Sequence, residues 1–460
     1  MENIVFNCLI EEIPYGAFQN CTSLSKIQIP ETIKYIRGYA FSGCSKLEEF
    51  TCPNSLEIIE ESVFANCTSL KAFSLNNVSI IGSSIFEGCN SLESVDLNSM
   101  ISVIPQSSFT GCSNLESVSP LNSVVRIESE AFKDCKTLNE VSLPNIIFIL
   151  DNAFQNCSGI EHIALGEGLE IIGKGAFSYC SKLESLVIPG NVEAFGVSML
   201  SGCSSLKELS FEEGNSPLSF PEGSYDSATS IQKKEVNGKM IQFKIEYYNP
   251  FFDGLPIEKL YIGRNLSDSP RYTISGDGDV DYYLITSFDS PFGNLPKLEK
   301  LTIGENVSTI GPKEAFIDEV GLAVTPGSFK NCSSLKEVIV KNPTPPTGAE
   351  FSKAAYSNAS LIVPGNTISL FQIADGWKEF LNILDETSVG IDAIARSNNF
   401  SISVCFDGII FQGEHSASVS IYGVDGKCQY SGNVSSGQSI ALSQGMYIVT
   451  IDGKSIKIKI

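Results

Sequence analysis

Cysteine is the residue type whose spacing in this sequence most suggests chemistry. Thiolates at a regular spacing could bind a metal ion or pair as disulfides, because equivalent positions of stacked strands lie roughly 5 Å apart. The same position of the pattern also holds Leu255 and Leu295, so a compact apolar group satisfies it. We therefore predict buried free thiols, no metal and no cofactor. The regular cysteines, at steps of 22 or 23 residues, are Cys21, Cys44, Cys67, Cys89, Cys112, Cys135, Cys157, Cys180 and Cys203.

The other residues that could catalyse a reaction are few. His162 and His415 are the only histidines, and neither lies in a G-x-S-x-G or H-E-x-x-H pattern. A carboxylate pair could cleave a glycosidic bond, but glutamates that recur along a repeat are more simply a solvated face. We predict that the protein is not an enzyme. Four cysteines fall outside the regular row and show no ligand spacing: Cys8, Cys52 (at a core-facing strand position), Cys405 and Cys428.

Two short patterns have a functional and a structural interpretation. Asp277, Asp279 and Asp281 resemble the start of a calcium loop, but the later Gly and the closing Glu are missing, which favours an acidic surface loop. The triplets that begin at Asn20 and Asn66 match the N-glycosylation pattern. Their middle residue is a cysteine of the buried row, so we interpret each Asn as a turn residue.

The cysteines belong to a repeat. Phe41-x-x-Cys44-x-x-Leu47 recurs along the chain, and the alternating residues that follow each Leu, such as Ile27 and Ile29, predict a short strand. One repeat cannot bury its apolar residues alone, so neighbouring repeats must stack. We predict about thirteen parallel strands in one curved sheet roughly 60 Å long. The sequence begins inside a repeat, from which we expect that the N-terminus is truncated.

The repeat resembles a known family. I-x-x-x-A-F-x-x-C-x-x-L-x-x-I-x-I-P, as in IGKGAFSYCSKLESLVIP, is similar to the BspA-type leucine-rich repeat over residues 1–385. The segment ASLIVPGNTISLFQIADGWKEFLNIL resembles the closing cap of members from anaerobic Gram-negative bacteria. The resemblance implies a curved solenoid on the cell surface and, for several members, adhesion. Within residues 1–385 we expect inserts at about 212–250 and 267–290 and a terminal cap at about 343–385.

The C-terminal residues follow a different pattern. Residues 386–399 are a polar linker, and the alternating runs in 400–460 are separated by Gly and Asp turns, which predicts a small β-sandwich. The segments SIYGVDGK and GMYIVTIDGK are similar to the C-terminal sorting domain of type IX secretion. This resemblance implies export across the outer membrane.

The composition limits which classes of partner can bind the protein and where in the cell it can be located. Fifty-three acidic against 31 basic residues give a net charge of −22, which repels nucleic acid and anionic lipid. No apolar run reaches 18 residues, so we expect no membrane span, and the first residues lack a signal peptide pattern. We expect an extracellular or outer-membrane surface location in a Gram-negative bacterium. The sequence leaves the oligomeric state open.

Strand alternation fixes which residues of the predicted sheet face solvent. The outward residues are mostly small and uncharged, so they offer few aromatic contacts and could accept an extended or basic polypeptide. His162 falls at another solvent-facing position. The central outward row is Gln28, Thr51, Ser74, Asp96, Ser119, Ser142, Ala164, Val187, Ser210, Tyr261, Thr302 and Ile339.

Tyrosines gather where the repeat period breaks, between Cys203 and Cys332. Tyrosine is enriched at interfaces because a stiff ring with a polar tip adds contact area at low entropic cost. The structural alternative is that longer repeats need larger side chains to cover themselves. We choose the inserts as the first candidate for a partner-binding site. The tyrosines are Tyr225, Tyr247, Tyr248, Tyr261, Tyr272, Tyr282 and Tyr283.

These observations predict a function in macromolecular recognition. We expect a non-catalytic solenoid that binds a host or envelope protein, as in adhesion. The alternatives are a structural spacer of the cell envelope and a secreted glycan-binding protein.

Overall fold

The computed structural model describes most of the chain. The described residues are 6, 10–220, 225–236, 239–248, 251–266, 272–275, 282–288, 291–311, 316–317, 323–324, 328–386, 400–405, 408–413, 417–423, 427–434, 438–442, 446–451 and 454–459. Only the backbone is described for the described residues that lie between 225 and 248, 272 and 288, 316 and 324, 400 and 417, and 451 and 459, and for residues 439, 446 and 448.

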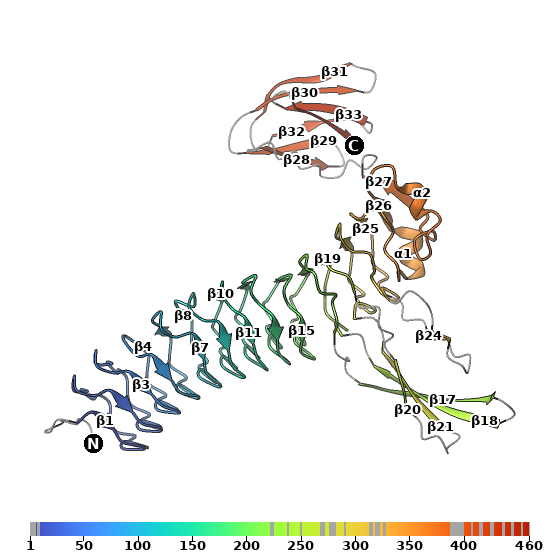
Figure 1. Cartoon of the computed structure of the whole chain (residues 1–460). Helices are drawn as coiled ribbons and strands as arrows, with labels where there is room; N and C mark the ends of the chain where they lie inside the picture. Colours follow the sequence, from blue (N-terminus) through green and yellow to red (C-terminus); the bar gives the residue numbers. More distant parts are fainter. Residues whose placement is uncertain are drawn as a thin grey trace.

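Between residues 10 and 386 the described residues outside the inserts wind into stacked coils, which confirms the predicted repeat solenoid (Figure 1). Each regular coil contains a main strand, a turn, a two-residue short strand and a second turn with the Phe and Cys of the repeat. The main strands are β4 (Ala72–Ser74), β6 (Ser94–Asp96), β8 (Ser117–Ser119), β10 (Glu140–Leu143), β12 (His162–Leu165), β14 (Ser185–Ile188), β16 (Glu208–Phe211), β19 (Lys259–Ile262), β22 (Lys300–Ile303), β25 (Glu337–Val340), β26 (Ser360–Val363) and β27 (Asn382–Asp385).

The prediction of one continuous sheet is wrong. The main strands form three parallel sheets, ordered β4-β6-β8, β10-β12 and β14-β16-β19-β22-β25-β26-β27. Proline explains the first break. The amides of Leu75 and Leu97 donate to the next coil at 3.0 and 2.7 Å, but Pro120 holds the equivalent position after β8 and has no N–H group to donate.

The short strands form a second ladder that the repeat pattern did not reveal. They pair in parallel in two sheets, β1-β2-β3-β5 and β15-β13-β11-β9-β7. Each short strand has one outward residue followed by one buried residue. Their bounds are β1 (Glu12–Ile13), β2 (Tyr35–Ile36), β3 (Ile58–Ile59), β5 (Ile80–Ile81), β7 (Val103–Ile104), β9 (Arg126–Ile127), β11 (Phe148–Ile149), β13 (Ile171–Ile172) and β15 (Ala194–Phe195).

The core of the solenoid is a column of stacked residues. The repeat phenylalanines lie ring on ring, with centroids 5.7 Å apart between Phe41 and Phe64 and 5.1 Å apart between Phe132 and Phe154. Each such ring pair contributes about 0.5–1.5 kcal/mol beyond its buried area. Because each coil buries its Phe, Cys and Leu against the next coil, the repeats stabilise one another.

The inserts join into one sheet, although they are separate in the sequence. The first insert contains β17 (Tyr225–Val236) and β18 (Lys239–Tyr248), and the second contains β20 (Tyr272–Ser275) and β21 (Tyr282–Phe288). They form one four-stranded sheet, ordered β17-β18-β21-β20, in which β18 and β21 run parallel. Figure 1 shows this insert sheet projecting away from the coils. A further hairpin, β23 (Phe316–Ile317) with β24 (Ala323–Val324), follows β22 and was not predicted.

The last coils contain two short helices, α1 (Lys353–Asn358) and α2 (Ile368–Phe371). Trp377 is fully buried between the aromatic rings of Phe351 and Phe371, and its indole Nε1 donates to the carbonyl of Pro346 at 2.7 Å. Phe351 stacks on Phe329 in the phenylalanine column, so Trp377 packs against the end of that column.

The C-terminal residues form two antiparallel sheets. One contains β28 (Phe400–Cys405), β29 (Gly408–Gly413) and β32 (Ser439–Ala441). The other has the order β31-β30-β33-β34, with β30 (Ala417–Gly423), β31 (Cys428–Val434), β33 (Met446–Ile451) and β34 (Lys454–Lys459). That these sheets pack as a sandwich stays a prediction.

Candidate binding surfaces

The cysteine row is a structural feature of the core. Twelve cysteines are described, all of them free, and ten of these are buried, which confirms the prediction of buried thiols for the described part of the chain. Cys8 and Cys405 lie outside the residues whose side chains are described. Burial raises the pKa of Cys44 to about 11 and the pKa of Cys112 to about 12. Neutral thiols of this kind are poor nucleophiles and poor metal ligands.

The sequence interpretation missed a hydrogen bond made by these thiols. The Sγ of Cys112 donates to the carbonyl of Phe86 in the preceding coil at 3.1 Å, and Cys135 donates to Phe109 at 3.2 Å. A leucine in the row cannot make this bond. The same bond recurs along the row, from Cys44, Cys67, Cys89, Cys157, Cys180, Cys203 and Cys332 to the equivalent Phe carbonyls.

The main-strand face is polar and shallowly hollowed. All twelve residues of the predicted outward row are exposed or half-buried, which confirms their orientation. A hollow of about 700 Å³ lies over β8, β10 and β12, and its lining includes Asn139, Glu140, Ser142 and the exposed His162. In the described part of the chain no three His, Cys, Asp or Glu side chains form a group that could hold a metal ion. His415 and the acidic segment 276–281 lie outside the residues whose side chains are described.

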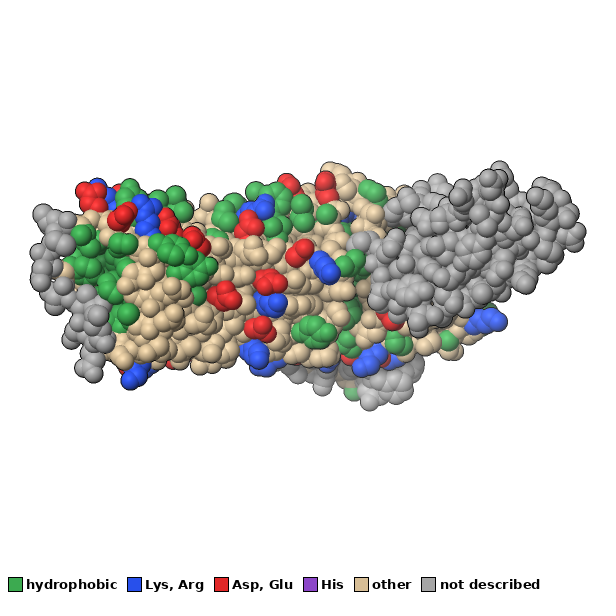
Figure 2. Space-filling model, turned by 90° about the horizontal axis from the view of Figure 1, so that it is seen from below, with side chains coloured by type: hydrophobic (Ala, Val, Ile, Leu, Met, Phe, Trp, Pro, Cys, Tyr) green, Lys and Arg blue, Asp and Glu red, His purple; other side chains and the backbone are tan. Residues whose placement is uncertain are grey.

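Ion pairs connect neighbouring coils along the solenoid. On the main-strand side, Lys259 Nζ lies 2.6 Å from Glu208 Oε1, and Lys336 Nζ lies 2.7 Å from Glu299 Oε1. Figure 2 shows one long face of the molecule, on which acidic and basic side chains are interspersed and apolar side chains gather in patches, one of them towards the N-terminal end. Exposed pairs of this kind contribute at most about 1 kcal/mol each.

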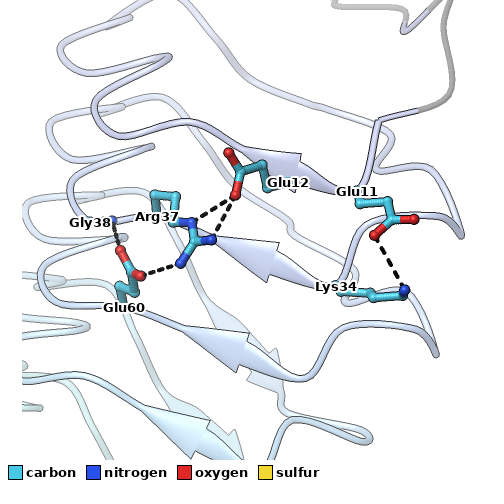
Figure 3. A network of polar contacts seen from close by, with 6 residues as sticks. All are labelled: Glu11, Glu12, Lys34, Arg37, Gly38 and Glu60. Atoms are coloured by element: carbon cyan, nitrogen blue, oxygen red, sulfur yellow. Dashed lines mark hydrogen bonds and ion pairs between the residues drawn. The ribbon is translucent and has the colours of Figure 1, made fainter.

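A denser charge network links the first short strands (Figure 3). Arg37 on the coil of β2 donates from Nη2 to Glu12 at 2.7 Å and from Nη1 to Glu60 at 2.8 Å. The second oxygen of Glu60 accepts from the amide of Gly38 at 2.9 Å. The hydrogen bond from Arg37 lowers the pKa of Glu60. Three successive coils are thus joined by one guanidinium.

The outward residues of the short strands form an apolar row, which we call the short-strand row. Ile80 is 55% exposed and Val103 is 36% exposed, and most of the others are half-buried. The repeat pattern alone did not separate these outward residues from the buried residue that follows each of them. In chain order the row is Glu12, Tyr35, Ile58, Ile80, Val103, Arg126, Phe148, Ile171 and Ala194.

The seven tyrosines of the predicted binding site lie in two separate sheets. Tyr261 lies half-buried on β19 in the main sheet, with the Lys341 ammonium 5.5 Å from its ring centre. Burial, reinforced by the nearby Glu213, raises the pKa of Tyr261. The other six tyrosines belong to strands of the insert sheet: Tyr225, Tyr247, Tyr248, Tyr272, Tyr282 and Tyr283.

The register of the insert sheet separates these six residues into two sets. Tyr248 pairs with Tyr225. Gln242, six residues before Tyr248 in the same strand, pairs with Tyr282. Phe243 pairs with Tyr283, and Tyr247 and Tyr272 both pair with Ser287. Because successive strand residues alternate between faces, Tyr225, Tyr248 and Tyr282 belong to one face and the other three to the opposite face.

A buried arginine lies between the two inserts. Arg264 is 1% exposed, and its Nη1 donates to the carbonyls of Gly190 and Val192 at 2.9 and 2.8 Å. Burial lowers the pKa of Arg264. This side chain ties the coil after the first insert to a coil more than 70 residues earlier. A cavity of about 280 Å³ lies nearer the base of the first insert, between Gly202 and Asp253.

Within the described part of the chain, no helix is long and apolar enough to cross a membrane.

Comparison with known proteins identifies the repeat. The family described as "BspA type Leucine rich repeat region" matches residues 1–116 and 102–232, with six copies. These residues make up just over half of the chain. No curated protein matches it.

Several solved structures are similar at low identity. A leucine-rich repeat protein from Bacteroides ovatus is 18% identical, with a TM-score of 0.43, and the match covers 84% of this chain and 83% of that one. A leucine rich cell surface protein from Faecalibacterium prausnitzii is 18% identical, with a TM-score of 0.33 and 72% and 83% covered. The pneumococcal vaccine antigen PcpA is 20% identical, with a TM-score of 0.32 and 79% and 68% covered.

The nine regular cysteines, the stacked coils and the family match over residues 1–232 agree with one another, and the chain belongs to the BspA-type leucine-rich-repeat family.

Proposed function

We propose that this protein is a non-catalytic recognition protein that acts at the cell surface, as in adhesion, and binds a protein ligand from a host or from the cell envelope. The observation that supports it most is the insert sheet. Two inserts, placed on successive coils, build one four-stranded sheet that projects from a rigid solenoid. Binding segments on a rigid scaffold are the usual arrangement of a recognition site.

We further propose that partner specificity resides in the insert sheet rather than in the main-strand face. Regular coils present nearly the same small polar residues many times, so they supply length and weak repeated contact but little discrimination. The insert strands carry six tyrosines, a residue type that frequently dominates binding energy. Tyr261 on the main sheet is a secondary contact.

The tail supports a surface location. The segments SIYGVDGK and GMYIVTIDGK belong to the C-terminal sheets and resemble a type IX sorting domain. A sorting signal at this end would deliver the solenoid to the outer surface. Fusing residues 400–460 to a periplasmic reporter tests this part, because a sorting signal should bring the reporter to the surface of a strain with type IX secretion.

The tyrosine hypothesis is tested with two triple variants, one for each face of the insert sheet. The partner is first isolated from host matrix and envelope extracts with the full chain. One variant replaces Tyr225, Tyr248 and Tyr282 by alanine, and the other replaces Tyr247, Tyr272 and Tyr283. The variant whose face contacts the partner should bind it at least roughly 30-fold more weakly, equivalent to roughly 2 kcal/mol, with an unchanged circular dichroism spectrum. The triple variant of the opposite face is the matched control.

Two outcomes contradict the proposal. If both triple variants and the quadruple variant of Tyr247, Tyr248, Tyr282 and Tyr283 keep full affinity, the inserts only cover the solenoid. If no extract yields a partner, the protein is a structural spacer of the envelope.

A further inference from the structure

Two tyrosines outside the inserts lie against each other on the first coils. Tyr15 is 65% exposed, and its ring centre lies 5.4 Å from that of the half-buried Tyr39, with the ring planes tilted by 52°. A side chain as exposed as that of Tyr15 covers little of the core. The pair therefore presents aromatic surface to solvent, and aromatic rings are among the side chains that contribute most to binding.

Tyr39 adopts a backbone conformation that is unfavourable for a bulky residue. Its φ is +59°, in the left-handed region, which residues other than Gly, Asn and Asp rarely adopt. The other regular repeats have small or polar residues at the same position, two before the repeat Phe or its Leu equivalent. Strained residues of this kind cluster at functional sites, so Tyr39 is a candidate for contact with a ligand. The equivalent residues are Gly16, Ser62, Ser84, Ser107, Glu130, Asn152, Gly175 and Ser198.

A carboxylate without a cation borders the tyrosine pair. Tyr15, Gly38 and Glu61 occupy the same position in three successive coils. A Cβ atom at Gly38 would lie 2.6 Å from Glu61 Oε1 and 3.2 Å from Tyr15 Cε2, so the carboxylate and the ring edge approach each other over the glycine. Glu61 is exposed, and within the described part of the chain no cation pairs with it. A ligand on the Tyr15 ring can therefore also reach this carboxylate.

The same coils show which group completes such an arrangement. The Arg37 guanidinium lies 5.0 Å from the ring centre of Tyr35. It also donates to the carboxylates of Glu12 and Glu60 (Figure 3). A planar guanidinium can stack on an aromatic ring while its N–H groups bind a carboxylate. The exposed tyrosine pair has the rings and the carboxylate, but no guanidinium of the described chain.

We propose that Tyr15, Tyr39 and Glu61, here called the N-terminal tyrosine site, bind an arginine side chain of a partner polypeptide. The ring faces and the carboxylate attract a cation, and the net charge of −22 draws basic polypeptides towards the protein. The carboxylate favours a cation with N–H donors over a quaternary ammonium group, which has none. This inference goes beyond the proposed function, because it assigns a second contact that does not involve the insert sheet.

Fluorine NMR of the full chain, labelled with 3-fluorotyrosine, tests the proposal. Replacing Tyr15, Tyr39 or Tyr179 by serine in turn identifies the resonance of each. Titration with acetyl-Gly-Arg-Gly-amide at roughly 150 mM NaCl, which screens unspecific attraction, should shift the Tyr15 and Tyr39 resonances together. The dissociation constant should be on the order of 1 mM, because a single exposed side chain is bound. Tyr179 is the internal control, since it is 55% exposed with φ +61° and its resonance should not move.

The charge of Glu61 allows a sharper test. Glu61→Gln keeps the size of the side chain and should raise the dissociation constant at least roughly 10-fold. Glu48→Gln is the matched control, because it removes another exposed carboxylate of the first coils and should leave the constant unchanged. A peptide with citrulline, the neutral isostere of arginine, should leave both tyrosine resonances in place.

Four results would overturn the proposal. The first is that the arginine peptide leaves the Tyr15 and Tyr39 resonances unmoved. The second is an equal response to the citrulline peptide, and the third is full affinity of Glu61→Gln. The fourth is tighter binding of choline chloride than of the arginine peptide, which would assign the site to a quaternary ammonium group instead.

Discussion

The thiols of the cysteine row combine two properties that leucine cannot. Cys112 is fully buried, so it fills the core, and its Sγ donates to Phe86 O of the preceding coil at 3.1 Å. The same carbonyl accepts the amide of Cys89 at 3.1 Å. Each thiol therefore supplies a second, weak hydrogen bond between coils, which explains why cysteine recurs at a position that also accepts leucine.

Replacing one of these thiols should destabilise the solenoid measurably. We expect Cys112→Ala to lower the free energy of unfolding by about 1–2 kcal/mol, because it leaves a small cavity and an acceptor without its thiol donor. Urea denaturation followed by circular dichroism measures the change. Cys428→Ala is the control, since Cys428 is exposed and its replacement should have no effect. Equal stability of the two variants would refute the assigned role.

The turn before each row cysteine has a defined backbone requirement. The residue that precedes the cysteine has a positive φ in each of the nine regular repeats, between +58° and +78°. Gly and Asn adopt this conformation most readily, which accounts for most of the residues found there. The interpretation of Asn20 and Asn66 as turn residues is consistent with these angles. The residues are Asn20, Gly43, Asn66, Gly88, Gly111, Asp134, Asn156, Tyr179 and Gly202.

Gly111 allows a test of this turn without steric interference. A Cβ atom at Gly111 would lie 3.8 Å from its nearest neighbour, Gly88, so space is available. We expect Gly111→Val to lower the free energy of unfolding by about 2 kcal/mol, because a β-branched residue is strained at φ +76°. Gly111→Asn should cost less than about half as much. Similar losses in the two variants would show that the backbone angle is not the cause.

The elements show what the sequence can and cannot predict. The repeat period predicted the stacked coils, and strand alternation predicted the outward row. The spacing did not predict that the main sheet breaks after β8 at Pro120. A proline's missing N–H donor affects the sheet only where a neighbouring strand would accept its hydrogen bond, and the spacing does not identify that strand. The pairing of β18 with β21 joins residues about 40 positions apart across an intervening coil, and no local pattern records it. Nor could spacing reveal that Ile80 and Val103 are exposed in successive coils.

At the scale of the whole molecule, stability is the sum of coils and of contacts between neighbouring coils. The buried thiols add a pH dependence to that sum. Burial raises the pKa of nine described cysteines above their ordinary value, whereas an unfolded thiol has a pKa of about 8.5. The nine are Cys44, Cys52, Cys67, Cys89, Cys112, Cys135, Cys180, Cys203 and Cys332.

We therefore expect the solenoid to lose stability in alkali. Below pH of about 8 both states keep their thiol protons, so the stability is complete. Between about pH 8.5 and 12 the unfolded state releases protons that the folded state retains, and each thiol removes up to about 1.4 kcal/mol per pH unit. Urea denaturation at pH 7 and pH 10 under reducing conditions measures this loss. A free energy of unfolding that is equal at the two values would contradict the burial of the thiols.

The central claim is that the insert sheet, and not the main-strand face, contacts the partner. Photo-crosslinking tests it most directly. A photoreactive phenylalanine analogue is placed at Tyr247 or Tyr248, one on each face of the insert sheet, and at Ser142 on the main-strand face. Each protein is irradiated with host matrix and envelope extracts. We expect a specific protein adduct from one of the insert positions and none from Ser142. An adduct formed only from Ser142 would contradict it.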